Sequence, residues 1–115
     1  MEMRRQAHSV FRCQYHIVWI PRYRWRVLKP GVKEYLLIKL DEVRKHYPEI
    51  EYIERNVQID HIHILVSFPP KYSISQVVQI MKQNTAQALK NKFIFLETTY
   101  RRSGIWSVGY FVSTV

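Results

Sequence analysis

Hydrophobic and polar residues follow two different periods along this chain, which predicts strands in some segments and helices in others. Four segments are rich in β-branched and aromatic residues, as strands are: 9–20, 50–58, 59–68 and 105–115. Pro21 ends the first of these segments, and Pro69 follows the third. In the last one Gly109 predicts a weak point or a bulge. No Asn-Gly signal marks the turn between the second and third strands, so we place it only broadly, within residues 56–60.

Two segments repeat hydrophobic residues at the i, i+3, i+4 spacing of an amphipathic helix. The first follows Pro30-Gly31, stops at Pro48, and has this stripe: Val32, Leu36, Leu40, Val43 and Tyr47. The second opens with Ser73 as a predicted N-cap and Gln76 three residues later, which is a capping box. Its predicted apolar stripe is Ile74, Val77, Val78, Met81, Thr85, Ala88 and Leu89.

The predicted order of elements is β-α-β-β-α-β, which is the ferredoxin-like arrangement of the α+β class. We expect a four-stranded antiparallel sheet with the first and third strands in the centre and both helices on one face. The chain has 115 residues and no repeat or linker, so we predict a single domain over residues 1–115.

His61 and His63 are the strongest chemical signal in the sequence. They lie two residues apart in the third predicted strand, so their side chains point to the same face. Ile62, Ile64 and Val66 point to the other face, which we expect under the helices. The two imidazoles would then lie on the open face, where a divalent metal ion can reach them. Spacing alone also allows one buried and one exposed histidine without any metal.

Two imidazoles leave a metal site unfinished, because structural zinc sites have four protein ligands and magnesium prefers oxygen ligands. Strand alternation turns the adjacent Asp60 away from the histidines, unless the strand is irregular there. Glu54 and Gln58 on the neighbouring strand are other options. The residues by themselves do not choose among these three.

The charge of the chain points to a polyanionic partner. Eighteen Lys and Arg residues against nine Asp and Glu give a formal net charge of +9. No apolar run approaches the ~20 residues of a membrane span, so we expect nucleic acid and neither a membrane nor a small-molecule substrate. Cys13 is the only cysteine, which excludes an intrachain disulfide and agrees with a reducing cytoplasm.

Cations alternate with aromatic residues immediately after the first strand, a composition that suits single-stranded nucleic acid. The alternative is a solvated charged loop, and surface lysines and arginines elsewhere are common without any ligand. The predicted DNA-binding residues are Arg22, Tyr23, Arg24, Trp25, Arg26, Lys82, Lys90, Arg101 and Arg102.

Four blocks together resemble the single-tyrosine HUH transposases, the small TnpA-type enzymes of bacterial and archaeal insertion sequences and their REP-associated relatives. These blocks are residues 15–24, 60–66, 73–75 and 106–115, and they occur in the family's order over nearly the whole chain. The resemblance implies the same ferredoxin-like fold. It also implies a prokaryotic, nucleoid-associated protein in the cytoplasm that acts as a homodimer.

The resemblance further implies a reaction. In the family, the positions of His61 and His63 bind Mg²⁺ or Mn²⁺, which polarises a phosphate in single-stranded DNA near a hairpin at the element's end. A tyrosine attacks that phosphate and leaves a 5′-phosphotyrosine link with a free 3′-hydroxyl. Rejoining to a different strand reverses this step.

The sequence departs from the family at its end. The family's nucleophilic tyrosine lies on a helix after the segment that matches residues 110–115, and a glutamine one turn later often completes the metal site. Tyr110 matches a structural position. We therefore expect a transposase domain that lacks its catalytic helix, binds hairpin DNA and does not cleave it alone. The alternatives are a non-catalytic nucleic-acid-binding regulator and a small metal-dependent hydrolase, which would leave the charge unexplained.

Overall fold

The computed structural model describes residues 12–115, and the predicted start of the first strand at residues 9–11 lies outside them. The chain forms the elements β1 (Cys13–Trp19), η1 (Arg22–Arg24), α2 (Val32–His46), β2 (Glu51–Gln58), β3 (His61–Phe68), α3 (Ile74–Lys92), α4 (Ile94–Thr99) and β4 (Phe111–Thr114). Within this part of the chain, none of the helices has the length and hydropathy that a membrane crossing requires.

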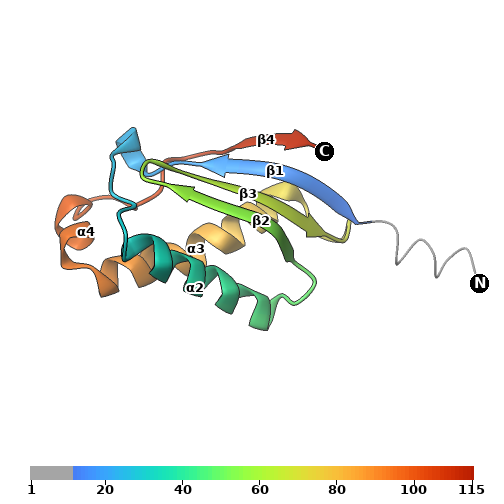
Figure 1. Ribbon diagram of the computed structural model, residues 1–115, viewed down its shortest axis with the longest axis horizontal. Helices are drawn as coiled ribbons and strands as arrows, with labels where there is room; N and C mark the ends of the chain where they lie inside the picture. Colours follow the sequence, from blue (N-terminus) through green and yellow to red (C-terminus); the bar gives the residue numbers. More distant parts are fainter. Residues whose placement is uncertain (1–11) are drawn as a thin grey trace, which may run out of the picture.

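The four strands form one antiparallel sheet in the order β2-β3-β1-β4. Helices α2 and α3 cover one face of this sheet and leave the other face open (Figure 1). The predicted ferredoxin-like α+β fold is therefore confirmed, with the first and third strands in the centre. This placement puts β3, which carries the histidine pair, between two hydrogen-bonded neighbours.

The core lies between the sheet and the two long helices. Ile17 on β1 pairs with Ile64 on β3, and both are fully buried. On α3 five of the seven residues of the predicted stripe are buried, and Ile74 and Ala88 are half-buried. The five are Val77, Val78, Met81, Thr85 and Leu89. Ser73 caps α3 as predicted, because its hydroxyl accepts a hydrogen bond from the Gln76 backbone N–H at 3.1 Å.

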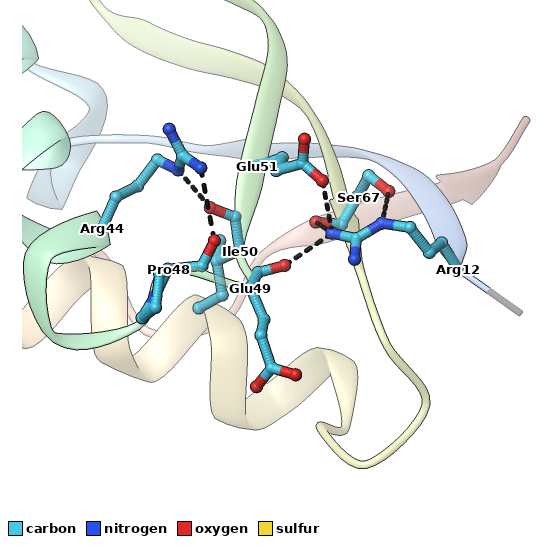
Figure 2. A network of polar contacts seen from close by, with 7 residues as sticks. All are labelled: Arg12, Arg44, Pro48, Glu49, Ile50, Glu51 and Ser67. Atoms are coloured by element: carbon cyan, nitrogen blue, oxygen red, sulfur yellow. Dashed lines mark hydrogen bonds and ion pairs between the residues drawn. The ribbon is translucent and has the colours of Figure 1, made fainter. Parts of the chain in front are cut away.

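Arginine side chains fix the end of α2 and the edge of the sheet (Figure 2). Arg12 donates to the Ser67 hydroxyl at 3.1 Å and to the Glu49 carbonyl at 2.6 Å, and it pairs with Glu51 at 2.8 Å. Arg44 donates to the Ile50 carbonyl at 2.7 Å. These contacts satisfy backbone carbonyls of the α2–β2 connection, which has no regular partner for them.

The last predicted strand is wrong in its extent. Only Phe111–Thr114 form β4, and residues 105–110 form an irregular segment. The hydrophobic residues that suggested a longer strand are real core residues, since Ile105 and Trp106 are buried. Gly109 has φ 89°, a left-handed conformation that breaks a strand, so its predicted role as a weak point is confirmed.

Two short helices were not predicted. Helix α4 follows α3 after a break at Phe93, and its six residues are too few to show a helical period. The turn η1 contains Tyr23 and Arg24 at φ 65° and 53°, values that sequence patterns do not predict for residues with side chains.

Candidate metal and DNA site

The histidine pair lies on the open face of the sheet, as predicted. Ile62, Ile64 and Val66 are fully buried under the helices. His61 and His63 alternate with them on β3 and are half-buried. A central strand supported by a packed core holds both imidazoles on one rigid element.

Asp60 lies beside His61, which corrects the expectation that its side chain turns away. It occupies the two-residue turn between β2 and β3, so strand alternation does not apply to it. Its Oδ1 lies 2.9 Å from Nδ1 of His61. An ionised carboxylate only accepts, so Nδ1 carries the hydrogen and the Nε2 lone pair of His61 stays available for a metal ion.

Arg24 completes this contact from the other side. Its Nε donates to Oδ2 of Asp60 at 3.2 Å. The hydrogen bond from His61 and the charge of Arg24 hold the pKa of the Asp60 carboxyl below its ordinary value. The carboxylate therefore stays ionised and keeps His61 in one orientation.

A third histidine, His16, joins the site and was not predicted. It lies on β1, and its Nδ1 is 3.0 Å from Nε2 of His63. The two rings stack with centroids 5.1 Å apart. Because β1 was predicted to lie beside β3, a position of residue 16 on the open face could have suggested this contact. Finding it also required the register of the two strands, which pairs Val18 with His63.

A pocket of about 500 Å³ opens above the pair. Its lining residues come from all four strands and the turn η1: Val18, Ile20, Arg24, Asn56, His61, His63 and Phe111. Among the alternative third ligands, Gln58 pairs with His61 in the sheet but donates to Asn56 at 2.7 Å, and Glu54 pairs with Leu65. Neither lines the pocket.

The donor set fits a weakly held metal ion. Within residues 12–115, no three His, Cys, Asp or Glu side chains converge as a metal site. The chain thus offers two imidazoles, one of them oriented by Asp60. Mg²⁺ and Mn²⁺ prefer oxygen ligands, so water and phosphate oxygens would have to supply most of the coordination of an ion held here.

Comparison with known proteins identifies the family. Residues 9–115 match the family described as Transposase IS200 like. The chain is 34% identical over 112 residues to the transposase of insertion sequence IS200 from Salmonella typhimurium, covering 95% of this chain and 71% of that protein. The chain belongs to the IS200-like transposase family. The function of this family is DNA transposition.

Further relatives agree with the IS200-like assignment. The ISDra2 transposase TnpA of Deinococcus radiodurans is 27% identical over 115 residues, covering all of this chain and 81% of that protein. A crystal structure of a D. radiodurans R1 protein described as a transposase has a TM-score of 0.82 at 26% identity, covering 92% of this chain and 81% of that one. A REP-associated tyrosine transposase bound to a REP hairpin shares the fold, with a TM-score of 0.63 at 14% identity over 90% of this chain and 56% of the other.

The tyrosines of this IS200-like chain lie away from the histidine pocket. All eight fall within the described residues, and none lines that pocket. Tyr35 and Tyr47 pack against the core as predicted, and Tyr110 bonds to Ser75 through their hydroxyls at 2.9 Å. Burial raises the pKa of Tyr52 and that of Tyr100, the latter to about 12, so these two hydroxyls are poor nucleophiles at neutral pH.

The predicted DNA-binding residues fall into two groups. Lys82 donates to the carbonyls of Ser107 and Gly109 at 2.8 and 2.7 Å, and Lys90 donates to that of Ser103 at 2.7 Å. These hydrogen bonds tie the two lysines to the 101–110 segment, so a structural role explains both side chains without a DNA contact. The others lie on or beside the η1 turn and the segment after α4: Arg22, Tyr23, Arg24, Trp25, Arg26, Arg101 and Arg102. Arg22 is half-buried, and the remaining six are exposed.

Proposed function

We propose that this chain is the DNA- and metal-binding part of a transposase that cuts and rejoins single-stranded DNA through a 5′-phosphotyrosine link. The observation that carries the proposal is the pair His61 and His63 on one face of the central strand, with Asp60 orienting the first. The pair would hold Mg²⁺ or Mn²⁺. When bound, such an ion would draw electron density from a phosphate oxygen and so ease attack on phosphorus.

The residues around the pair have supporting roles. Asp60 fixes the ring of His61, and Arg24 keeps Asp60 ionised and in place. His16, in contrast, lies at Nε2 of His63 and competes with a metal ion for this nitrogen. Phe111, Val18 and Ile20 form an apolar wall of the pocket, which limits the water around a phosphate bound there.

The nucleophile in this proposal is a tyrosine that this protomer's pocket does not contain. None of the eight tyrosines lines the pocket, so the 115 residues bind DNA without forming a covalent bond to it. Incubating the purified chain with Mn²⁺ and a labelled hairpin that carries a single-stranded tail tests this. We expect no denaturant-resistant adduct, and an adduct would contradict the proposed role of the tyrosines.

The proposed partner is single-stranded DNA with a hairpin. The net charge of +9 favours a polyanion, and a neighbour in fold is a transposase bound to a REP hairpin. Binding of a labelled hairpin should weaken steeply when salt rises from 50 to 200 mM, by the roughly 10³–10⁵-fold that 6–10 phosphate contacts give for duplex DNA. Affinity that is constant over this range would refute a phosphate-based interface.

A homodimer is also part of the proposal. The edge strand β4 is exposed along its whole length, and Phe111 and Val112 are among its exposed hydrophobic residues. An uncovered edge with apolar side chains favours pairing with a second chain. Sedimentation velocity should show a dimer, and Val112→Lys should shift the population to monomer.

A non-catalytic DNA-binding regulator is the second candidate. It is favoured by the absence of a tyrosine from the pocket lining and of a third clustered ligand among residues 12–115. Fusing a tyrosine-bearing helix after Val115 separates the two candidates. The transposase proposal expects nicking of tailed hairpins that is lost on His61→Ala, whereas a regulator stays inactive.

A further inference from the structure

A second pocket, separate from the histidine pocket, lies where the η1 turn meets the segment after α4. It has a volume of about 430 Å³, and its lining residues share aromatic, hydroxyl or cationic side chains: Tyr23, Trp25, Thr98, Thr99, Arg101, Arg102 and Ser103. None of these seven residues lines the histidine pocket.

Three aromatic rings lead from the core to the mouth of this pocket. Tyr100 is buried, and its hydroxyl donates to the Arg22 carbonyl at 3.1 Å. Trp25 packs on Tyr100 with centroids 5.6 Å apart, and Tyr23 packs on Trp25 at 4.9 Å. Tyr23 is 67% exposed and Trp25 45%, so the outer rings offer faces to solvent while the inner ring holds them in place.

The backbone that presents Tyr23 is strained. Both Tyr23 and Arg24 have positive φ, which costs a residue with a side chain roughly 1–2 kcal/mol. Three contacts hold the turn in this conformation: Arg24 N–H to the Pro21 carbonyl at 2.7 Å, Arg22 N–H to the Ile105 carbonyl at 2.7 Å, and the Tyr100 hydroxyl bond. A fold that keeps a large exposed ring on a strained turn suggests a ligand for that ring.

Positive charge surrounds the same pocket. Arg101 and Arg102 are exposed, and neither makes an ion pair or side-chain hydrogen bond with another residue of the part that the structure describes. No carboxylate is among the lining residues, although Glu97 lies four residues before Arg101 in the sequence. Free guanidinium groups beside exposed aromatic faces match a nucleotide, whose phosphate and base they bind respectively.

We propose that this pocket binds one unpaired nucleotide of the DNA, with its base against Tyr23 and Trp25 and its phosphate against Arg101 and Arg102. This inference rests on the proposed function for the identity of the polymer. A base inside a duplex is already stacked on both faces, so the pocket selects single-stranded over double-stranded DNA. Because Arg24 in the same turn contacts Asp60, the bound strand lies close to the histidine pair.

The test uses the oligonucleotide dT6 and the intrinsic fluorescence of the full 115-residue chain. Trp25 is the exposed tryptophan, whereas Trp19 and Trp106 are 1% and 6% exposed, so stacking on Trp25 should quench the emission. We expect saturable quenching by dT6. An abasic hexamer with the same phosphates should bind at least ~5-fold more weakly, because stacking contributes about 1–3 kcal/mol per base.

Variants then assign the two interactions. Tyr23→Ala should weaken dT6 binding about 10-fold and leave abasic binding unchanged, whereas Tyr23→Phe should bind dT6 like the wild type. Arg101→Ala with Arg102→Ala should weaken both oligonucleotides. Lys33→Ala with Lys45→Ala removes the same charge from exposed positions on α2 and serves as the control, with circular dichroism as the check of folding.

Two outcomes would overturn the proposal that this pocket binds a nucleotide. One is equal binding of dT6 and the abasic hexamer, and the other is an equal effect of the Arg101/Arg102 and Lys33/Lys45 pairs. A different result would refute the proposed function alone. In that case dT6 quenches the fluorescence of the wild type as expected, but the protein binds neither a hairpin substrate nor a metal ion at His61 and His63.

Discussion

His16 and His63 share a hydrogen bond between β1 and β3, with Nδ1 of His16 and Nε2 of His63 3.0 Å apart. Their rings also stack, at 5.1 Å between centroids. Nε2 of His63 therefore has a hydrogen-bond partner. Asp60 binds Nδ1 of His61, and within residues 12–115 Nε2 of His61 has no hydrogen-bond partner. A metal ion that uses Nε2 of His63 must displace His16.

His16→Phe tests this competition. Phenylalanine keeps the stacking but has no ring nitrogen, so His63 loses its hydrogen-bond partner. We expect Mn²⁺ to bind about 5-fold more tightly, because the net value of one hydrogen bond is ~1 kcal/mol. Isothermal titration with Mn²⁺ measures the change. Weaker binding would mean that His16 is itself a metal ligand and would contradict the competition.

Asp60→Asn tests the carboxylate that orients His61. The amide preserves the shape but removes the charge that favours a hydrogen on Nδ1. We expect Mn²⁺ affinity to fall about 10- to 100-fold, the usual effect of removing a group that orients a metal-binding histidine. Asp41→Asn is the matched control, because Asp41 pairs with Arg55 on the α2 side of the sheet. Equal effects of the two substitutions would show that Asp60 acts only through net charge.

Much of this arrangement follows from sequence patterns. The hydrophobic periods predict four strands, the last of them too long, and two helices. Ile62, Ile64 and Val66 place the histidine pair on the open face. The position of Asp60 does not follow, because it depends on where a turn without an Asn-Gly signal begins. His16 needed the register of β1 on β3, which long-range pairing sets.

The irregular parts of the fold were the hardest to predict, because they too depend on contacts between residues far apart in the sequence. Ile105 and Trp106 are buried without belonging to a strand, so hydrophobic content alone overestimates β4. The positive φ values of Tyr23 and Arg24 depend on contacts with Pro21, Tyr100 and Ile105. Local composition carries no information about such contacts.

Thr85 stabilises the segment before β4. Its hydroxyl accepts from Trp106 Nε1 at 3.0 Å and donates to the Met81 carbonyl at 2.8 Å, and it is fully buried. Thr85→Val leaves the buried indole N–H without a partner. We therefore expect urea denaturation to show that the free energy of unfolding falls by about 1–3 kcal/mol. The same change at exposed Thr114 should stay within ~0.5 kcal/mol. If Thr85→Val lowers the free energy of unfolding no more than Thr114→Val does, the stabilising role of this hydrogen bond is refuted.

Glu34 makes the stability of the protein depend on pH at the start of α2. Its carboxylate accepts a hydrogen bond from the Gly31 backbone N–H, which lowers the pKa of Glu34. A carboxyl group with a lower pKa in the folded state stabilises the fold above its unfolded pKa, near 4.5, and this stabilisation is lost as the pH falls through the folded value. The difference in Tm between the wild type and Glu34→Gln should therefore shrink between pH 6 and pH 3. A difference that is independent of pH would contradict this.

Mn²⁺ binding to the 115-residue chain, followed by electron paramagnetic resonance of the free ion, is the decisive test of a metal site at His61 and His63. We expect the wild type to bind Mn²⁺ and His61→Ala and His63→Ala each to weaken binding at least 10-fold. His46→Ala, at an exposed position at the end of α2, should leave binding unchanged. Equal binding by the wild type and all three variants would contradict the assignment of His61 and His63 as the metal site.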